Sequence, residues 1–466
     1  MQVPSSTTAV SAPGKVLLAG GYLVLDRQYT GLVFGLSARI NVIAQEIRTS
    51  QGVQLSEIIV ESPQFLEAQW RYGYHLAHGN GGIKLTQLQV GTSQINANPF
   101  VETTLAYALT YIIAAAHLKP SHAFAPARLT VLADNDYYSQ PHSATSTPSS
   151  PPSSSSHHRF AKFPTKLKDA HKTGLGSSAA LVTALTAALL THYLPRAAFD
   201  LATDAGRRVL HDLAQAAHCA AQGKVGSGFD VAAAVYGSCA YRRFSPSVLA
   251  GLPEAGAPGF APALAGCVGS DAWDTEVVKV TKTAAGATTE VRMPPGVALR
   301  MCDVDCGSQT VGMVKQVLKW READAAASRA LWDELQARNE ALGAVLSSSS
   351  GDRKTEIAPA VAAVRELVRR MGAASGVPIE PESQAALLDA LRDNVEGVHE
   401  GVVPGAGGFD ALALLVRDDE ATEVRIKEFL ARWSREKGGS VRLLDVKGET
   451  EGVRREGLEQ YEGWIA

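Results

Sequence analysis

Cysteine is scarce in this chain of 466 residues and lacks the spacing of a disulfide or metal site. The five cysteines are odd in number, and no two of them form a C-x-x-C pair. This pattern argues against a disulfide framework and against a zinc site, and it fits a reducing compartment. We therefore expect a cytoplasmic protein.

An excess of charge of one sign is also absent, as are long apolar runs. Lys and Arg total 44 against 47 Asp and Glu, for a net charge of -3. This balance offers no general attraction to nucleic acid or to an acidic membrane. No stretch approaches about 20 uninterrupted apolar residues, and the N-terminus has no basic region followed by an apolar one. We expect no nucleic-acid, membrane or obligate protein partner, so any anion site must be local.

The Walker motif G-x-x-x-x-G-K-[ST] is missing too, yet one stretch is suited to phosphate. Residues 172–180, Lys-Thr-Gly-Leu-Gly-Ser-Ser-Ala-Ala, form a glycine-rich turn that opens into an Ala/Leu-rich helical run ending near Leu190. Glycines let the backbone approach a ligand closely, and the first N–H groups of a helix bind anions. A turn that merely caps a helix has the same pattern. The dinucleotide fingerprint G-x-G-x-x-A fits poorly, because residues 159–171 are charged and interrupted by proline where that motif needs a buried strand.

Length and composition predict two domains, 1–245 and 246–466. The boundary is placed near 245 because residues 245–296 are rich in Gly, Ala and Pro and have few long periodic elements. Residues 139–158 are mostly Ser, Pro, Thr and His, which predicts a disordered insertion. Its paired His157 and His158 are more typical of a solvated tract than of a metal site.

Helical and strand-like segments interleave in both parts, which predicts an α+β or mixed α/β protein. The expected helices span residues 100–117, 177–190, 207–222, 231–236, 311–342, 359–371 and 384–392, and the expected strands span residues 16–19, 31–44, 128–133, 297–304, 411–416 and 441–446.

Four further segments each have an ordinary explanation when taken alone. They are residues 12–15 (Ala-Pro-Gly-Lys before a strand), 226–230 (Gly-Ser-Gly-Phe-Asp before a helix), 303–308 (Asp-Val-Asp-Cys-Gly-Ser between a strand and a helix) and 404–410 (Pro-Gly-Ala-Gly-Gly-Phe-Asp before a strand). A turn lysine, a helix cap, an alternating strand end and a tight turn would account for them. In this order, with the glycine-rich turn between the first two, coincidence is hard to sustain.

The order resembles the GHMP kinase superfamily, with its N-terminal Pro-x-Gly-Lys segment, its central Gly-Leu-Gly-Ser-Ser-Ala phosphate loop and its C-terminal glycine-rich loop. Within that superfamily the chain is most similar to the fungal type of phosphomevalonate kinases. The segments that carry this likeness are Gly-Gly-Tyr-Leu-Val-Leu at 20–25, Tyr-Thr-Gly-Leu-Val at 29–33, Asn-Pro-Phe-Val-Glu at 98–102, Lys-Val-Gly-Ser-Gly-Phe-Asp-Val at 224–231 and Asp-Cys-Gly-Ser-Gln-Thr at 305–310.

The resemblance implies an α+β fold of two domains, the first like domain 2 of ribosomal protein S5 and the second ferredoxin-like. It implies ATP as co-substrate, Mg²⁺, and mevalonate 5-phosphate as the acceptor. The implied site residues are Lys15, Lys172 and Asp230 for catalysis; Asn98, Lys172, Gly174, Leu175, Gly176, Ser177, Ser178 and Ala179 for ATP; Lys15, Tyr22, Ser227, Gly228, Ser308, Gly405, Ala406, Gly407 and Gly408 for the acceptor; and Ser177 and Ser178 for the metal.

Two positions depart from the superfamily pattern. Residues 20–22 are Gly-Gly-Tyr where many members have Gly-Glu-His, and the helix before Asp230 offers His218, Cys219 and Gln222 where many members have a metal-binding glutamate. Three alternatives stay open. They are a kinase for mevalonate or another alcohol with Asp230 as an obligatory base, a sensor that keeps the kinase fold without catalysis, and a nicotinamide-dependent oxidoreductase that rests on the glycine fingerprint alone.

Overall fold

The structure is a computed structural model, and it describes residues 7–48, 50, 57–89, 97–116, 124–139, 159–282, 288–304, 310–347 and 354–465. The strands are β1 (Thr8–Ala19), β2 (Gly31–Glu46), β3 (Glu57–Glu61), β4 (Gln69–Leu76), β5 (Ile83–Leu88), β6 (Ala127–Ala133), β7 (Cys239–Arg242), β8 (Glu276–Val278), β9 (Val280–Lys282), β10 (Thr288–Glu290), β11 (Val297–Val304), β12 (Val398–Val402), β13 (Ala411–Arg417), β14 (Val441–Glu449) and β15 (Arg454–Arg455).

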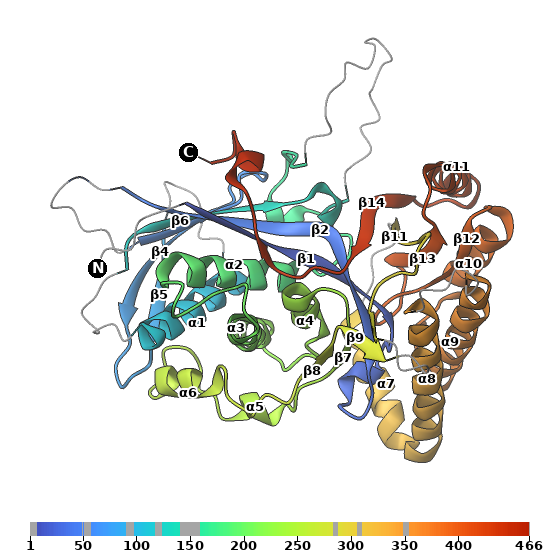
Figure 1. The fold of residues 1–466 in the computed structure, drawn as a ribbon, viewed down its shortest axis with the longest axis horizontal. Helices are drawn as coiled ribbons and strands as arrows, with labels where there is room; N and C mark the ends of the chain where they lie inside the picture. Colours follow the sequence, from blue (N-terminus) through green and yellow to red (C-terminus); the bar gives the residue numbers. More distant parts are fainter. Residues whose placement is uncertain are drawn as a thin grey trace, which may run out of the picture.

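The helices lie mostly below and to the right of the sheet in Figure 1. They are α1 (Pro99–Ala115), α2 (Ser177–Tyr193), α3 (Asp204–Gln222), α4 (Phe229–Tyr236), α5 (Ser247–Ala250), α6 (Phe260–Cys267), α7 (Thr310–Ala323), α8 (Ala325–Leu346), α9 (Lys354–Ser375), α10 (Glu382–Asn394) and α11 (Glu420–Lys437), with short 3-10 turns η1 (Leu23–Leu25), η2 (Asn135–Tyr137), η3 (Leu167–Asp169) and η5 (Leu458–Tyr461).

One large sheet runs through both halves of the molecule. Its strands follow the order β12-β13-β11-β14-β2-β6-β3-β4-β5, while β1 and β7 pair with β2, β15 pairs with β1, and β8 pairs with β7. Neighbouring strands are antiparallel except β3 and β6, which run parallel. The division into residues 1–245 and 246–466 stays a prediction; β8 and β15 both bond to strands of the N-terminal part.

Helix α2 is the centre of the N-terminal core. It packs against β1 and β2 on one side and against α1 and α3 on the other, as Figure 1 shows. Its run of Ala, Leu, Val and Thr is apolar all round, which is the composition of a helix buried on every side. Because this helix is fixed so firmly, its N-terminus is a rigid support for the turn that precedes it.

A second core fills the space between β11, β12, β13 and helices α10 and α11. The C-terminal chain then returns to the first half. Strand β14 bonds to β11 at one end and to β2 at the other, and β15 bonds to β1. The buried side chain of Arg39 on β2 holds this return in place, because it donates to Ser11 on β1, to Glu449 on β14 and to the carbonyl of Gly452.

Most expected elements are confirmed, and two expectations are corrected. The helix expected over residues 311–342 is two helices, because Asp324 stands between α7 and α8 and its carboxylate accepts from Ala327 N as the N-cap of α8. Lys15 does not precede its strand but lies within β1. A bulge between Pro13 and Gly14 allows a proline inside the strand. The insertion predicted over residues 139–158 lies, from residue 140 onward, outside the described residues.

Candidate active site

The glycine-rich turn forms an open helix N-terminus. Gly174 and Gly176 have φ values of 74° and 84°, which side-chain-bearing residues rarely adopt. Gly176 is the N-cap of α2 and has no side chain with which to cap the first N–H groups of the helix. These groups and the positive end of the helix dipole are free for an anion. Residues 159–173, the described segment before the turn, contain isolated bridges at Lys166 and Lys172 but no strand of the kind that the dinucleotide fingerprint needs.

Lys15 lies directly against this turn. Its backbone N–H donates to Leu175 O at 2.9 Å, and its Nζ donates to Gly174 O at 3.2 Å. A Cβ atom at Gly176 would lie 2.7 Å from Lys15 Cε, so a side chain at this position would displace the lysine in addition to straining the backbone. Strand β1 therefore places a cation beside the glycine-rich turn.

Asp230, in the first turn of α4, lies close enough to Lys15 to affect its ammonium group. Burial lowers the pKa of the Lys15 ammonium, and the Asp230 carboxylate partly offsets this by raising it. The Phe229 ring lies 5.7 Å from Lys15 Nζ. The Asp230 side chain itself is partly exposed.

His218 on α3 lies close to Ser178 and Asp230. Its Nε2 lies 3.2 Å from Ser178 Oγ, 3.2 Å from Gln222 Nε2 and 3.9 Å from Asp230 Oδ2. The sequence identified His218 only as a departure from the superfamily pattern. The structure places it between the phosphate turn and Asp230.

A cavity opens beside Lys172, Ser177 and Ser178. Asn98 is the N-cap of α1, where its side chain accepts from Val101 N, and it lines this cavity. The Lys172 side chain is exposed, yet desolvation of its ammonium lowers its pKa. Phe100 and Val101 of the segment 98–102 also line it. The sequence did not single out other lining residues, which come from distant parts of the chain and carry no motif; among them are Val60, Ser62, Trp70, Val131 and Tyr138.

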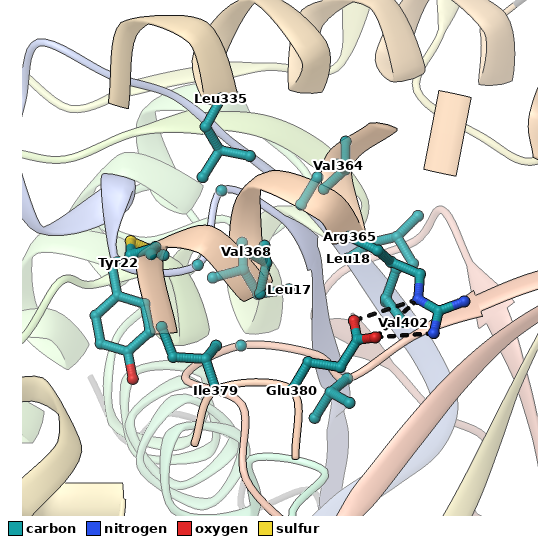
Figure 2. Close-up of a pocket in the computed structure, with 16 residues that line it drawn as sticks. Leu17, Leu18, Tyr22, Leu335, Val364, Arg365, Val368, Ile379, Glu380 and Val402 are labelled. Carbon is teal, nitrogen blue, oxygen red and sulfur yellow. Dashed lines mark hydrogen bonds and ion pairs between the residues drawn. The ribbon is translucent and has the colours of Figure 1, made fainter. Parts of the chain in front are cut away.

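Two predicted acceptor residues, Tyr22 and Gly405, line a second cavity (Figure 2). Tyr22 has a φ of 66°, which is unusual for a residue with a side chain, and its hydroxyl donates to Ala406 O at 2.7 Å. Gly405 N donates to Leu17 O, and a Cβ at Gly407 would overlap the carbonyl oxygen of Ile379. Figure 2 shows Tyr22 on one side and the buried Arg365–Glu380 ion pair on the other.

Four more predicted residues remain, and the structure describes three of them. Gly228 has a φ of 85°, and a Cβ there would lie 2.7 Å from Tyr241 Oη, whose hydroxyl donates to Ser227 O. The turn at 227–228 is thus held tightly at the start of α4. Gly408 N donates to Ile379 O. Ser308 lies outside the described residues.

Two negative findings apply to the described part of the chain. It holds no group of three or more His, Cys, Asp or Glu side chains arranged to bind a metal ion. None of its helices is both long enough and apolar enough to cross a membrane.

Comparison with known proteins decides the family. The GHMP kinases N terminal domain family matches residues 163–238, which span the turn, α2, α3 and α4. A phosphomevalonate kinase of Gibberella zeae is 63% identical over 466 residues, covering 100% of both chains. The chain belongs to the phosphomevalonate kinase family. A peroxisomal phosphomevalonate kinase of Arabidopsis thaliana is 35% identical and covers 89% of this chain and 90% of its own.

The fold of the family is confirmed by a solved structure. The phosphomevalonate kinase of Streptococcus pneumoniae, in complex with phosphomevalonate and AMPPNP, aligns with a TM-score of 0.57 over 95% of this chain and 99% of its own. At 17% identity this likeness concerns the fold alone. The expected α+β GHMP kinase fold is therefore confirmed, and the oxidoreductase alternative is excluded by family membership.

Proposed function

We infer that this chain transfers the γ-phosphoryl group of ATP to mevalonate 5-phosphate, which yields mevalonate 5-diphosphate and ADP on the route to isoprenoids and sterols. One observation carries the inference. Lys15 lies beside both the glycine-rich turn at the N-terminus of α2 and Asp230 at the N-terminus of α4. The names of its relatives at 63% and 35% identity support the same reaction.

The acceptor's chemistry sets the tasks of the site. A phosphate monoester has its second pKa near ~6, so its oxygen is mostly ionised at neutral pH and needs little base catalysis. The harder task is to bring two anionic groups together, and phosphoryl transfer depends mainly on positioning and charge neutralisation. Lys15 and Lys172 supply that positive charge. Asp230 orients Lys15 and accepts the residual proton when the acceptor is monoanionic.

The remaining residues bind the two substrates. The N–H groups of residues 174–179 hold the ATP phosphates, and Asn98 and the cavity beside Lys172 hold the rest of the nucleotide. The acceptor contacts Ser227, Gly228 and the start of α7, while Tyr22 and residues 405–408 shape the wall behind it. Ser308 keeps its proposed role as a phosphate ligand.

The described side chains fit Mg²⁺ bound mainly through ATP. Ser177 and Ser178 offer hydroxyls at the helix start, and no cluster of three acids or histidines is found in the described residues. Mg²⁺ commonly keeps several waters and takes few protein ligands besides substrate phosphates. When bound, it supplies positive charge to the phosphate oxygens.

We further propose a cytoplasmic location, on the composition and on the cysteine pattern. The Arabidopsis relative is named as peroxisomal, which makes the location a separate question from the reaction. Fluorescence microscopy of the full chain tagged at either end, beside a peroxisomal marker, tests it. Punctate overlap with the marker would contradict the proposal.

The reaction is tested by ADP release from Mg-ATP with mevalonate 5-phosphate, mevalonate and galactose offered in parallel. We expect turnover with mevalonate 5-phosphate alone and a diphosphate product. Turnover with an unphosphorylated alcohol would indicate an alcohol kinase, and nucleotide binding without any turnover would support a sensor.

A further inference from the structure

One acid of the sequence motifs has no part in the proposed reaction. Asp303 lies near the end of β11, where the segment 303–308 begins, and its side chain is 8% exposed. It stands opposite Arg442 of the neighbouring strand β14, whose Nε donates to Asp303 Oδ2 at 3.1 Å. The two residues therefore form a cross-strand ion pair in the C-terminal half of the chain.

This ion pair contacts the N-terminal half at two consecutive residues. The Ser139 hydroxyl donates to Asp303 Oδ2 at 2.7 Å, and Arg442 Nη2 donates to Tyr138 O at 3.2 Å. Both hydrogen bonds have one charged partner, and such bonds are roughly twice as strong as those between neutral groups. The sheet that contains β11 and β14 consequently holds residues 138–139 in place.

Residues 138–139 in turn lie beside the predicted catalytic lysine. Tyr138 and Lys172 form an antiparallel bridge, and Ser139 N donates to His171 O at 2.9 Å. Tyr138 and Lys172 also line the same cavity, to which we assign the nucleotide. Gly174, where the glycine-rich turn begins, follows two residues later. A displacement of residues 138–139 would therefore move Lys172 and the start of the turn.

Lys172 depends on this support because its own segment is not part of a strand. Residues 159–173 contain isolated bridges only, so the regular hydrogen bonds of the sheet do not hold the backbone there. The Tyr138 ring packs against Phe65 and Phe163. These aromatic contacts fix the ring, whereas Arg442 fixes the carbonyl of the same residue.

We propose that Asp303 and Arg442 are positioning residues that hold Lys172 at the cavity through Tyr138 and Ser139. The inference rests on the proposed function, in which Lys172 supplies positive charge to the transferred group. Such charge stabilises a transition state best when it is held in advance where charge develops. The C-terminal half of the chain thus takes part in the nucleotide site as well as in the acceptor site.

Steady-state kinetics of the full chain with Mg-ATP and mevalonate 5-phosphate tests this role. Arg442→Met keeps the apolar stem of the side chain and removes its donors, whereas Arg442→Lys keeps the charge. We expect Arg442→Met to lower kcat about tenfold, because a small misplacement of a catalytic group is costly. The KM for mevalonate 5-phosphate should stay unchanged. Arg442→Lys should recover most of the loss, and Ser139→Ala should lower kcat by less than Arg442→Met does.

Arg417→Met is the matched control. Arg417 lies on β13 of the same sheet and also pairs with carboxylates, those of Asp419 and Glu396. These partners belong to the C-terminal part of the chain, so this variant should turn over as the wild type does. Thermal melting of each variant shows whether it is folded.

A double-variant cycle identifies the route of the effect. If Arg442 acts through Lys172, adding Arg442→Met to Lys172→Ala lowers kcat no further. Additive losses would overturn the positioning role and leave the ion pair as a structural contact. A raised KM for mevalonate 5-phosphate with an unchanged kcat would overturn it as well, because the effect would then lie at the acceptor.

The dissociation constant of ADP, measured by calorimetry, separates a failure of this inference from a failure of the proposed function. Arg442→Met should bind ADP several-fold more weakly than the wild type, and Arg417→Met should bind it equally well. A wild type that binds ADP but does not phosphorylate mevalonate 5-phosphate would overturn the proposed function, while a selective loss of ADP affinity in Arg442→Met would still support the positioning of the cavity. Equal kcat and equal ADP affinity in the two methionine variants would overturn the inference alone.

Discussion

At the scale of single residues, two lysines carry the proposed charge neutralisation. Lys15 lies against the phosphate turn and Lys172 lines the neighbouring cavity. Replacing either by alanine should lower kcat by at least about 10²-fold if each stabilises charge in the transition state. Steady-state kinetics with mevalonate 5-phosphate measures this. Lys168→Ala, an exposed lysine on η3, is the control, and near-normal turnover of Lys15→Ala would remove Lys15 from the role.

The protonation of these lysines predicts a pH dependence. Burial lowers the pKa of Lys15 from its ordinary 10.5, so its ammonium loses its proton at a lower pH than a free lysine. The charged form is the active one, and kcat/KM should therefore fall as pH rises through that lowered pKa. The profile is best measured in Lys172→Arg, whose guanidinium stays charged throughout. A profile that stays flat up to pH 10.5 would contradict the assignment.

Two glycines of the turn make a matched pair of substitutions. Both have positive φ, so alanine at either should cost about 1–2 kcal/mol of stability. At Gly174 a Cβ meets nothing within 4 Å, whereas at Gly176 it meets the Lys15 side chain. We expect Gly176→Ala to reduce kcat at least about tenfold more than Gly174→Ala does, because only the former displaces the lysine. Equal kinetic losses would show that Lys15 adjusts without consequence.

At the scale of elements, Tyr22 at the start of η1 contacts the loop at residues 404–410, which precedes β13, and so joins two segments that we assign to the acceptor site. The Tyr22 hydroxyl donates to Ala406 O, so Tyr22→Phe keeps the buried ring and removes one of the hydrogen bonds that hold this loop. We expect KM for mevalonate 5-phosphate to rise several-fold, with a smaller change in kcat and a stability loss of about 1 kcal/mol. Tyr193→Phe removes a similar bond, to Ala125 O, far from the site. An unchanged KM in Tyr22→Phe would argue that the loop takes no part in acceptor binding.

At the scale of the whole molecule, the buried Arg39 ties the first strands to the returning C-terminal chain. Arg39→Ala removes the buried guanidinium that donates to Ser11, Glu449 and Gly452 O, and only Glu449 keeps an ion pair, with Arg454. The loss of these charged hydrogen bonds should cost about 3–5 kcal/mol in the free energy of unfolding. Arg128→Ala on the adjacent β6 removes a half-exposed arginine 3.7 Å from Glu61 and should cost about 0–1 kcal/mol. Urea denaturation compares the two. Similar midpoints would mean that the C-terminal return contributes little to global stability.

The local features of this protein follow from its amino-acid sequence alone. The glycine-rich turn, the buried helix after it and the acid at the start of α4 depend on neighbouring residues, because backbone freedom, helix capping and apolar periodicity are short-range properties. The order of these motifs along the chain is also sufficient to indicate the superfamily. The helix break at Asp324 and the strand bulge at Pro13 also have local causes, a helix cap and a proline. The sequence analysis missed both because the apolar residues on either side continue the pattern of one element.

Which distant residues meet is settled by the packing of the chain in three dimensions. Lys15 faces Gly174 and Gly176 across 159 positions or more, and the cavity beside Lys172 draws its walls from β3, β4, α1 and β6. In the sequence His218 resembles an ordinary core residue of an amphipathic helix; its contact with Ser178 exists because α2 and α3 pack side by side. Such contacts depend on how sheets and helices pack, and no local pattern of residues encodes them.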